Sequence, residues 1–107
     1  MIAKLKSAAA IDLKKGDNEI FVLADDTNGA KITEIIASNK SSAQIKVSIR
    51  IYKASLNDIV TIIPPMTFIA NEGKVIPLAT ILEPGDKVLA ETNAANSVDV
   101  LISVIEL

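Results

Sequence analysis

Apolar and polar residues alternate most clearly in the middle of the chain. Every second residue from Ile45 to Ile51 is a branched aliphatic residue, and the positions between them, Lys46 to Tyr52, are mostly polar. Alternate residues of an extended strand point to opposite faces. The pattern therefore predicts a strand over Ala43–Lys53 with one buried face and one solvated face.

Short apolar runs separated by Gly, Pro, Asn and Asp occupy the rest of the chain from residue 11 onward. A helical interpretation would place these turn-forming residues inside helices, so we expect strands instead. Asn28-Gly29 predicts a hairpin, and Pro64-Pro65 is expected to end a strand, because proline cannot donate to a sheet ladder. The predicted strands are 19–24, 31–38, 43–53, 59–63, 66–70, 75–82, 87–92 and 97–107.

These signals predict an all-β fold, a single antiparallel β-sandwich of Ig-like or jelly-roll-like kind with about seven or eight strands over residues 11–107. Residues 1–10 are expected to be a short N-terminal arm, with Ile2, Leu5 and Ala9 at a spacing that hints at a helix. Ten residues make a marginal helix in water, so the arm is either frayed or ordered on a neighbouring subunit. Its lysines oppose an acidic C-terminal stretch, which would suit head-to-tail contacts.

Several strands carry more aliphatic residues than one buried face requires. In the last strand, Val98 to Val104 supply one face at every second position, yet Leu101 and Ile105 lie on the other. Loops could cover such a second face, or a neighbouring subunit could. A contiguous exposed apolar patch usually marks an interface. We therefore expect an interface that includes Leu101 and Ile105, together with Ile2 and Leu5 of the arm.

Composition narrows the possible functions further. The chain has 107 residues with a formal net charge of −2, 3% aromatic residues, and no His, Cys or Trp. One domain is expected at this length. Without His or Cys, nucleophilic triads and the usual zinc sites are excluded, and the charge balance is poor for nucleic acid. We expect no enzyme activity, no metal or other cofactor, no nucleic-acid partner and no membrane span, since no apolar run approaches the roughly 18 residues needed.

Three groups of residues have side chains that could bind a metal, act as acid and base, or bind a sugar. Asp25, Asp26 and Asn28 lack the spacing of a calcium loop, so a turn is the simpler interpretation. Glu83-Pro84-Gly85-Asp86 pairs two carboxylates, but a turn with Pro and Gly at its corners explains it. Two further aromatic residues could contribute to a sugar-binding platform, and cross-strand or core packing is the alternative. These residues are Tyr52 and Phe68.

The C-terminal part of the chain carries a Leu-x-x-Gly-Asp turn at Leu82–Asp86 and a Ser-Val-Asp-Val strand at Ser97–Val100. These and other turn and strand motifs over residues 11–107 resemble those of small tailed-bacteriophage virion proteins with a β-sandwich fold. Similar segments lie upstream, at 29–32, 36–40, 62–65 and 73–76. The resemblance implies a structural role as a capsid decoration, neck, tail or fibre component. It implies no catalytic residues.

We therefore expect a non-enzymatic virion component that forms a homo-oligomer and contacts other virion proteins, made in the host cytoplasm and located on the particle. The alternative is a ligand- or carbohydrate-binding module that uses the loops of a rigid sandwich. Its site would lie in loops 25–29, 71–74 or 93–96.

Overall fold

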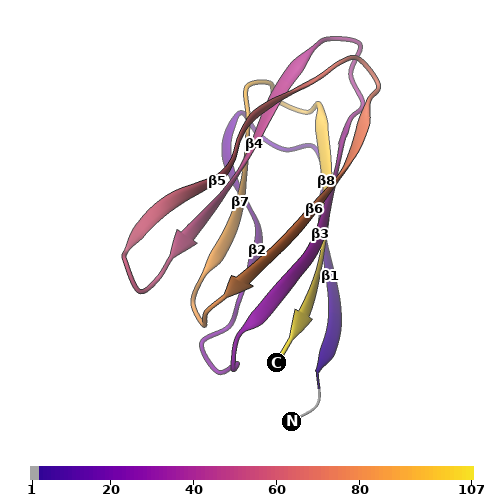
Figure 1. Ribbon diagram of the computed structural model, residues 1–107. Helices are drawn as coiled ribbons and strands as arrows, with labels where there is room; N and C mark the ends of the chain where they lie inside the picture. The colour runs from indigo at the N-terminus through magenta and orange to yellow at the C-terminus, as the bar shows by residue number, and fades with distance from the viewer. Residues whose placement is uncertain (1–2) are drawn as a thin grey trace.

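The computed structural model describes residues 3–107, and these form two antiparallel sheets of four strands packed face to face (Figure 1). The predicted all-β sandwich is thus confirmed, with eight strands. Their bounds are β1 Lys4–Ala10, β2 Gly16–Val22, β3 Ala30–Asn39, β4 Ile45–Lys53, β5 Asp58–Phe68, β6 Gly73–Leu82, β7 Lys87–Thr92 and β8 Val98–Glu106.

The strand order distinguishes between the two kinds of sandwich that the sequence left open. One sheet has the order β1-β8-β3-β6 and the other β2-β7-β4-β5. Every connection except β4–β5 therefore crosses from one sheet to the other. This is the arrangement of a jelly roll, in which the chain winds around a barrel-like core, and not that of an Ig domain.

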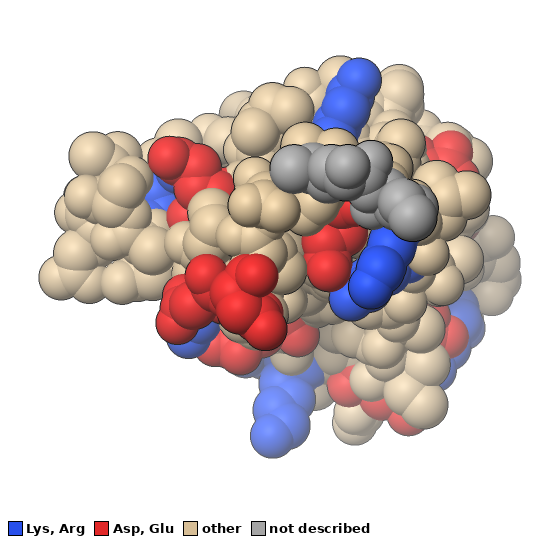
Figure 2. All heavy atoms as spheres, turned by 90° about the horizontal axis from the view of Figure 1, so that it is seen from below, with Lys and Arg blue, Asp and Glu red and all other residues tan. Residues whose placement is uncertain are grey.

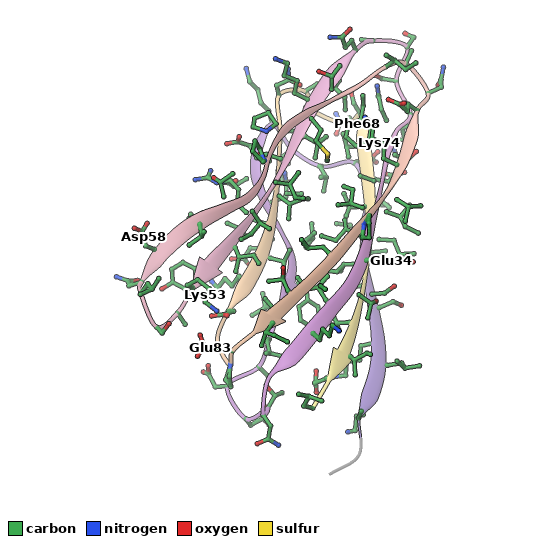
Figure 3. All side chains as sticks on the ribbon, viewed as in Figure 1. Glu34, Lys53, Asp58, Phe68, Lys74 and Glu83 are labelled. Carbon is green, nitrogen blue, oxygen red and sulfur yellow. The ribbon has the colours of Figure 1, made fainter. Side chains whose placement is uncertain are left out.

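The core lies between the two inner faces. Alternation in β4 works as predicted, because Ile45, Val47, Ile49 and Ile51 are all buried. β8 contributes its inward residues in the same way, and Phe68 at the end of β5 is completely enclosed (Figure 3). The largest side chains with no more than 1% exposure are Phe68, Leu23, Ile32, Ile35, Ile45, Ile49, Ile51, Leu82, Ile102, Val47, Val88 and Val98.

Residues 4–10 correct the prediction of a separate arm. They form β1, which pairs with β8 from Lys4↔Glu106 to Ala10↔Val100 without a register shift. The helical spacing was misleading, because alternation of small and larger residues also suits an edge strand. Ala8 and Ala10 face the core and are partly buried. The sandwich therefore begins before residue 11.

Two turn predictions are also wrong. Asn28-Gly29 does not close a hairpin, because the strands on either side, β2 and β3, belong to different sheets. Gly29 still adopts a positive φ of 112°, so the local conformation that the dipeptide favours is present in a crossover loop.

Pro64-Pro65 lies inside β5 and does not end it. The β4–β5 register shifts between Val47 and Ile49, opposite the two prolines. β5 is an edge strand, and prolines are tolerated at edges and at irregularities of the ladder.

A buried carboxylate fixes the loops at one end of the sandwich. The Asp86 side chain is fully buried and accepts hydrogen bonds from the backbone N–H groups of Glu83, at 2.8 Å, and Ala54, at 3.0 Å. Lys53 Nζ, at the end of β4, forms ion pairs with both Asp86 and Glu83 of the β6–β7 turn (Figure 3). Asp86 thereby ties the β6–β7 turn to the end of β4.

These contacts set the ionisation of Asp86. Burial alone would raise the pKa of this carboxyl, but the hydrogen bonds from Lys53 and the two backbone N–H groups outweigh it and lower the pKa. A lowered pKa means that the folded state binds fewer protons than the unfolded state. The stabilisation is therefore complete above the unfolded-state pKa and is lost as the pH falls through the folded-state pKa.

Asp86→Asn should consequently destabilise the fold by about 2–3 kcal/mol at neutral pH, because Lys53 loses its buried anion. The loss should begin to shrink as the pH falls below about 3.9, the ordinary pKa of an aspartate, and should be smallest once the pH has passed through the lower folded-state pKa of Asp86. Urea unfolding at several pH values measures this, with the exposed Asp26→Asn as the control. Equal stability of Asp86→Asn and wild type at neutral pH would contradict the role of Asp86.

Candidate functional site

The predicted interface residues that lie within the described part of the chain come together on one surface. Leu5 of β1 lies directly opposite Ile105 of β8, and Leu101 lies opposite Ala9. All four face away from the second sheet. Leu5 is 84% exposed, Leu101 is 40% exposed, and Ile105 is partly buried. Ile2 lies outside the described residues.

The sheet register adds members that sequence reasoning missed. Leu101 is flanked on its other side by Ile36 of β3, and Ile36 in turn lies opposite Val75 of β6. Ala9, Leu101, Ile36 and Val75 therefore form one row across all four strands. A signal was present in the pair Ile35-Ile36, which places an aliphatic residue on each face of β3.

A second row runs parallel to the first. It contains Leu5, Ile105, Lys31 and Ile81, which are successive partners across the same four strands. Val75 and Ile81, at the far ends of the two rows, are each 61% exposed. We call the apolar members of both rows the outer apolar face. It consists of Leu5, Ala9, Ile36, Val75, Ile81, Leu101 and Ile105.

A polar band separates the two rows. Ser7, Ser103 and Glu34 are successive cross-strand partners, and Glu34 projects from the side of the sheet that faces away from the core (Figure 3). The Thr33 hydroxyl donates to the Ser103 carbonyl at 3.1 Å, next to an irregularity in β3. Leu5, Ser7, Thr33 and Ser103 help to line a shallow hollow of about 310 Å³.

Asp99, near the start of β8, lies at the border of the outer apolar face. The backbone N–H of Asp12 donates to Asp99 at 2.9 Å, and Lys40 Nζ lies 3.0 Å from the same oxygen. The hydrogen bond from Asp12 and the lysine together lower the pKa of Asp99. Asp99 therefore stays ionised beside the apolar rows.

The sequence predicted that opposite charges near the two ends of the chain would suit head-to-tail contacts, and one such pair forms within the molecule. Lys6 Nζ lies 3.0 Å from Glu106 Oε2, because β1 begins beside the end of β8. Figure 2, viewed toward that end, shows basic and acidic side chains interspersed rather than separated into two regions. Lys6 and Glu106 therefore neutralise each other within one molecule.

The outer face of the second sheet has a different character. Arg50 of β4 bonds to Asp17 of β2 at 2.9 Å and to Glu91 of β7 at 3.4 Å, and Lys87 pairs with Glu19 at 3.1 Å. Leu89, on the same outer side, is only 6% exposed. Ion pairs and polar side chains thus cover the middle of this face. Aliphatic residues are exposed at its edges, where Val22 of β2 is 50% exposed and Ile59 of β5 is 37% exposed.

The residues considered for catalysis or metal binding lie in a turn and a crossover loop of the sandwich. Glu83 and Asp86 belong to the lysine-linked turn described above, so the two carboxylates have defined structural partners. Asp25, Asp26 and Asn28 lie in the β2–β3 crossover. Within residues 3–107, no cluster of three or more carboxylate, imidazole or thiol side chains has the arrangement of a metal site.

The loops and aromatic residues considered for carbohydrate binding do not converge. Phe68 is buried in the core, whereas the Tyr52 hydroxyl lies 2.6 Å from Asn57 Oδ1 in the β4–β5 turn. Loop 25–29 contacts the end of β8 through the bond from Asn28 N–H to the Leu107 carbonyl. Loops 71–74 and 93–96 lie at the opposite end, near Asn39. A hollow of about 320 Å³ lies on the second sheet beside Lys46 and Glu91.

None of the described segments is a helix of the length and apolarity needed to cross a bilayer.

Comparisons with known proteins show the fold. No protein-family model matches the sequence, and no curated protein matches it. Solved structures do match. A chain from the acid-stable capsid structure of the Helicobacter pylori bacteriophage KHP30 superposes with a TM-score of 0.64 at 16% identity, over 100% of this chain and 89% of that one.

Two other structures share the fold. A chain from the T13 viral particle of infectious bursal disease virus gives a TM-score of 0.61 at 8% identity over 96% of this chain. The present chain spans 31% of the length of that viral chain. The globular domain of the zebrafish complement 1qA protein gives 0.57 at 12% identity, over 94% of both chains. The chain is thus a jelly-roll sandwich like those in viral particles and in a complement domain.

A charge should cost little stability at Leu101 but a great deal at Ile102, the next residue of β8. Leu101→Asp places a carboxylate at the solvated outer face and should cost about 1 kcal/mol of unfolding free energy. Ile102→Asp buries the same group in the core and should cost more than about 4 kcal/mol or prevent folding. Circular dichroism with urea unfolding of both variants measures this. Similar large losses for both would mean that Leu101 belongs to the core.

Proposed function

We propose that this protein is a non-enzymatic structural subunit of a phage virion, of the capsid-decoration kind. It works through contacts between subunits made by the outer apolar face. The observation that carries the proposal is the apolar surface on a sheet whose inner face already supplies the core.

The free energy of burial gives the physical reason. Covering a large aliphatic side chain that is otherwise exposed is worth about 1.5–3 kcal/mol, in proportion to the area removed from water. Leu5, Val75 and Ile81 are each more than half exposed. A surface with several such residues in register gains substantially when another protein covers it.

The phage capsid comparison supports a subunit that consists of a single small jelly-roll domain. The superposition spans nearly the whole of both chains, so that capsid structure contains a chain that consists almost entirely of one such domain. A small separate jelly-roll chain is therefore a component that a phage capsid can include. The infectious bursal disease virus chain instead contains the domain as one part of a longer protein.

Light scattering after size-exclusion chromatography tests the contact surface. The wild-type chain should form a defined oligomer at high concentration, and Leu5→Asp should shift it toward the monomer, because an ionised carboxylate on the apolar face opposes burial. Ile69→Asp is the matched control, since Ile69 is 60% exposed but lies in the β5–β6 loop. A wild-type monomer, or equal effects of the two variants, would contradict the proposed contact surface.

A second measurement tests the location. Antibodies raised against this protein should label the surface of particles of the virus that encodes it. Immunogold electron microscopy measures this. Particles in which mass spectrometry finds no trace of the chain would overturn the virion assignment.

A further inference from the structure

The four sheet edges differ in how well they are protected against pairing with another chain. β6 contains Pro77 and a register shift, and β5 contains Pro64 and Pro65. β2 has a register shift between Glu19 and Phe21. Prolines and irregularities of this kind prevent an edge from adding another strand. β1 has neither, and it keeps one register with β8 over its whole length.

Lysine is a further device that protects an edge, and β1 has two. Lys6 is already paired with Glu106. Lys4 lines a hollow together with Asp26 and Glu106. Since residues alternate along a strand, both lysines lie on the opposite face from Leu5, Ser7 and Ala9. Neighbouring carboxylates therefore reduce the repulsion that these lysines would exert on an approaching edge.

We propose that a second copy of this chain pairs with β1 antiparallel about a two-fold axis at Ser7, which joins the two β1-β8-β3-β6 sheets into one eight-stranded sheet. The inference rests on the proposed function, because it adds a contact between subunits at the free edge of the sheet that carries the outer apolar face. In this register Ser7 faces Ser7 of the partner copy, and Leu5 faces Ala9 of the partner copy. Each lysine faces an alanine.

The neighbouring symmetric registers are less favourable. A two-fold axis at Lys6 places two lysines directly opposite one another, which is destabilising. An axis at Ala8 requires Asp12 to continue the strand, but Asp12 has a φ of 50° and bonds to Asp99 outside the strand. The Ser7 register is the one that uses the full length of β1 from Lys4 to Ala10.

The self-complementary β1 edge provides the argument for a second copy as the occupant. Leu5 is 84% exposed at the free edge, and the small side chain of Ala9 leaves space for it in the opposing strand. Pairing connects the Leu5–Ile105 row of one copy with the Ala9–Leu101–Ile36–Val75 row of the other. Both rows thus become continuous across the axis.

Cysteine cross-linking tests this register directly, because the chain has no cysteine. In Ser7→Cys, the two introduced residues would face each other with Cα atoms about 4.5–5.5 Å apart, which is within the range of a disulfide. Ser103→Cys is the matched control. It introduces the same side chain on the same face, but one strand further in, so two copies would lie three strand spacings, about 14 Å, apart.

Under a mild oxidant that accepts the thiol electrons, Ser7→Cys should convert to a covalent dimer about tenfold faster than Ser103→Cys. A mixture of Leu5→Cys and Ala9→Cys should give the mixed dimer. No dimer from Ser7→Cys, equal rates for the two variants, or a preferred dimer between Ser7→Cys and Ala9→Cys would each overturn the proposed register.

Light scattering separates this outcome from the failure of the proposed function. If the wild-type chain forms an oligomer that Leu5→Asp weakens, but Ser7→Cys does not cross-link, the edge pairing is wrong and the outer apolar face remains the contact surface.

Discussion

The packing of two apolar inner faces against each other is the interaction on which the rest of the structure depends. It fixes which side of every strand is inward, and therefore which side chains remain outside. β8 shows this most clearly, because Val100, Ile102 and Val104 are buried in the core while Leu101 and Ile105 point outward. The core is complete without the outer residues, so their apolar character has to be explained by something else.

The contrast between the two outer faces provides that explanation. On the β2-β7-β4-β5 sheet, Arg50 holds Asp17 and Glu91 in an ion-paired cluster above Leu89, so the protein covers its own surface there. On the other sheet, one row of aliphatic residues crosses all four strands, and a second row has aliphatic residues on β1, β8 and β6 with Lys31 on β3. The second sheet also exposes aliphatic residues, but fewer and less fully, with Val22 at 50% and Ile59 at 37% against 84% for Leu5 and 61% for Val75 and Ile81. This difference is the reason for proposing that another protein covers the first sheet.

Local patterns predicted the strands well, since alternation and turn residues act over a few positions. β4, β6 and β7 lie close to where their periodicity places them. The long-range arrangement could not be predicted in the same way. Asn28-Gly29 has the chemistry of a hairpin turn, yet the next strand pairs in the other sheet, and no local signal records that choice. Pro64-Pro65 is tolerated because β5 is an edge strand, which again depends on sheet order.

The outer apolar face was likewise predictable only where the signal lies within a single strand. Leu101 and Ile105 were identified because they interrupt the alternation of their own strand. Ile36 and Val75 were missed, because their membership depends on a register that brings four distant segments side by side. Leu5 was assigned to the interface but placed on a free arm. The short polar and alanine-rich run that follows it does not resemble a sheet strand until β8 is present to pair with it.

A cryo-electron microscopy reconstruction of the assembled protein would show which face of the sandwich is in contact with other subunits. We expect the outer apolar face of β1-β8-β3-β6 to be covered by another subunit, with the ion-paired face of β2-β7-β4-β5 in solvent. An assembly in which Leu5, Leu101 and Val75 face solvent while the Arg50 cluster forms the contact would contradict this expectation.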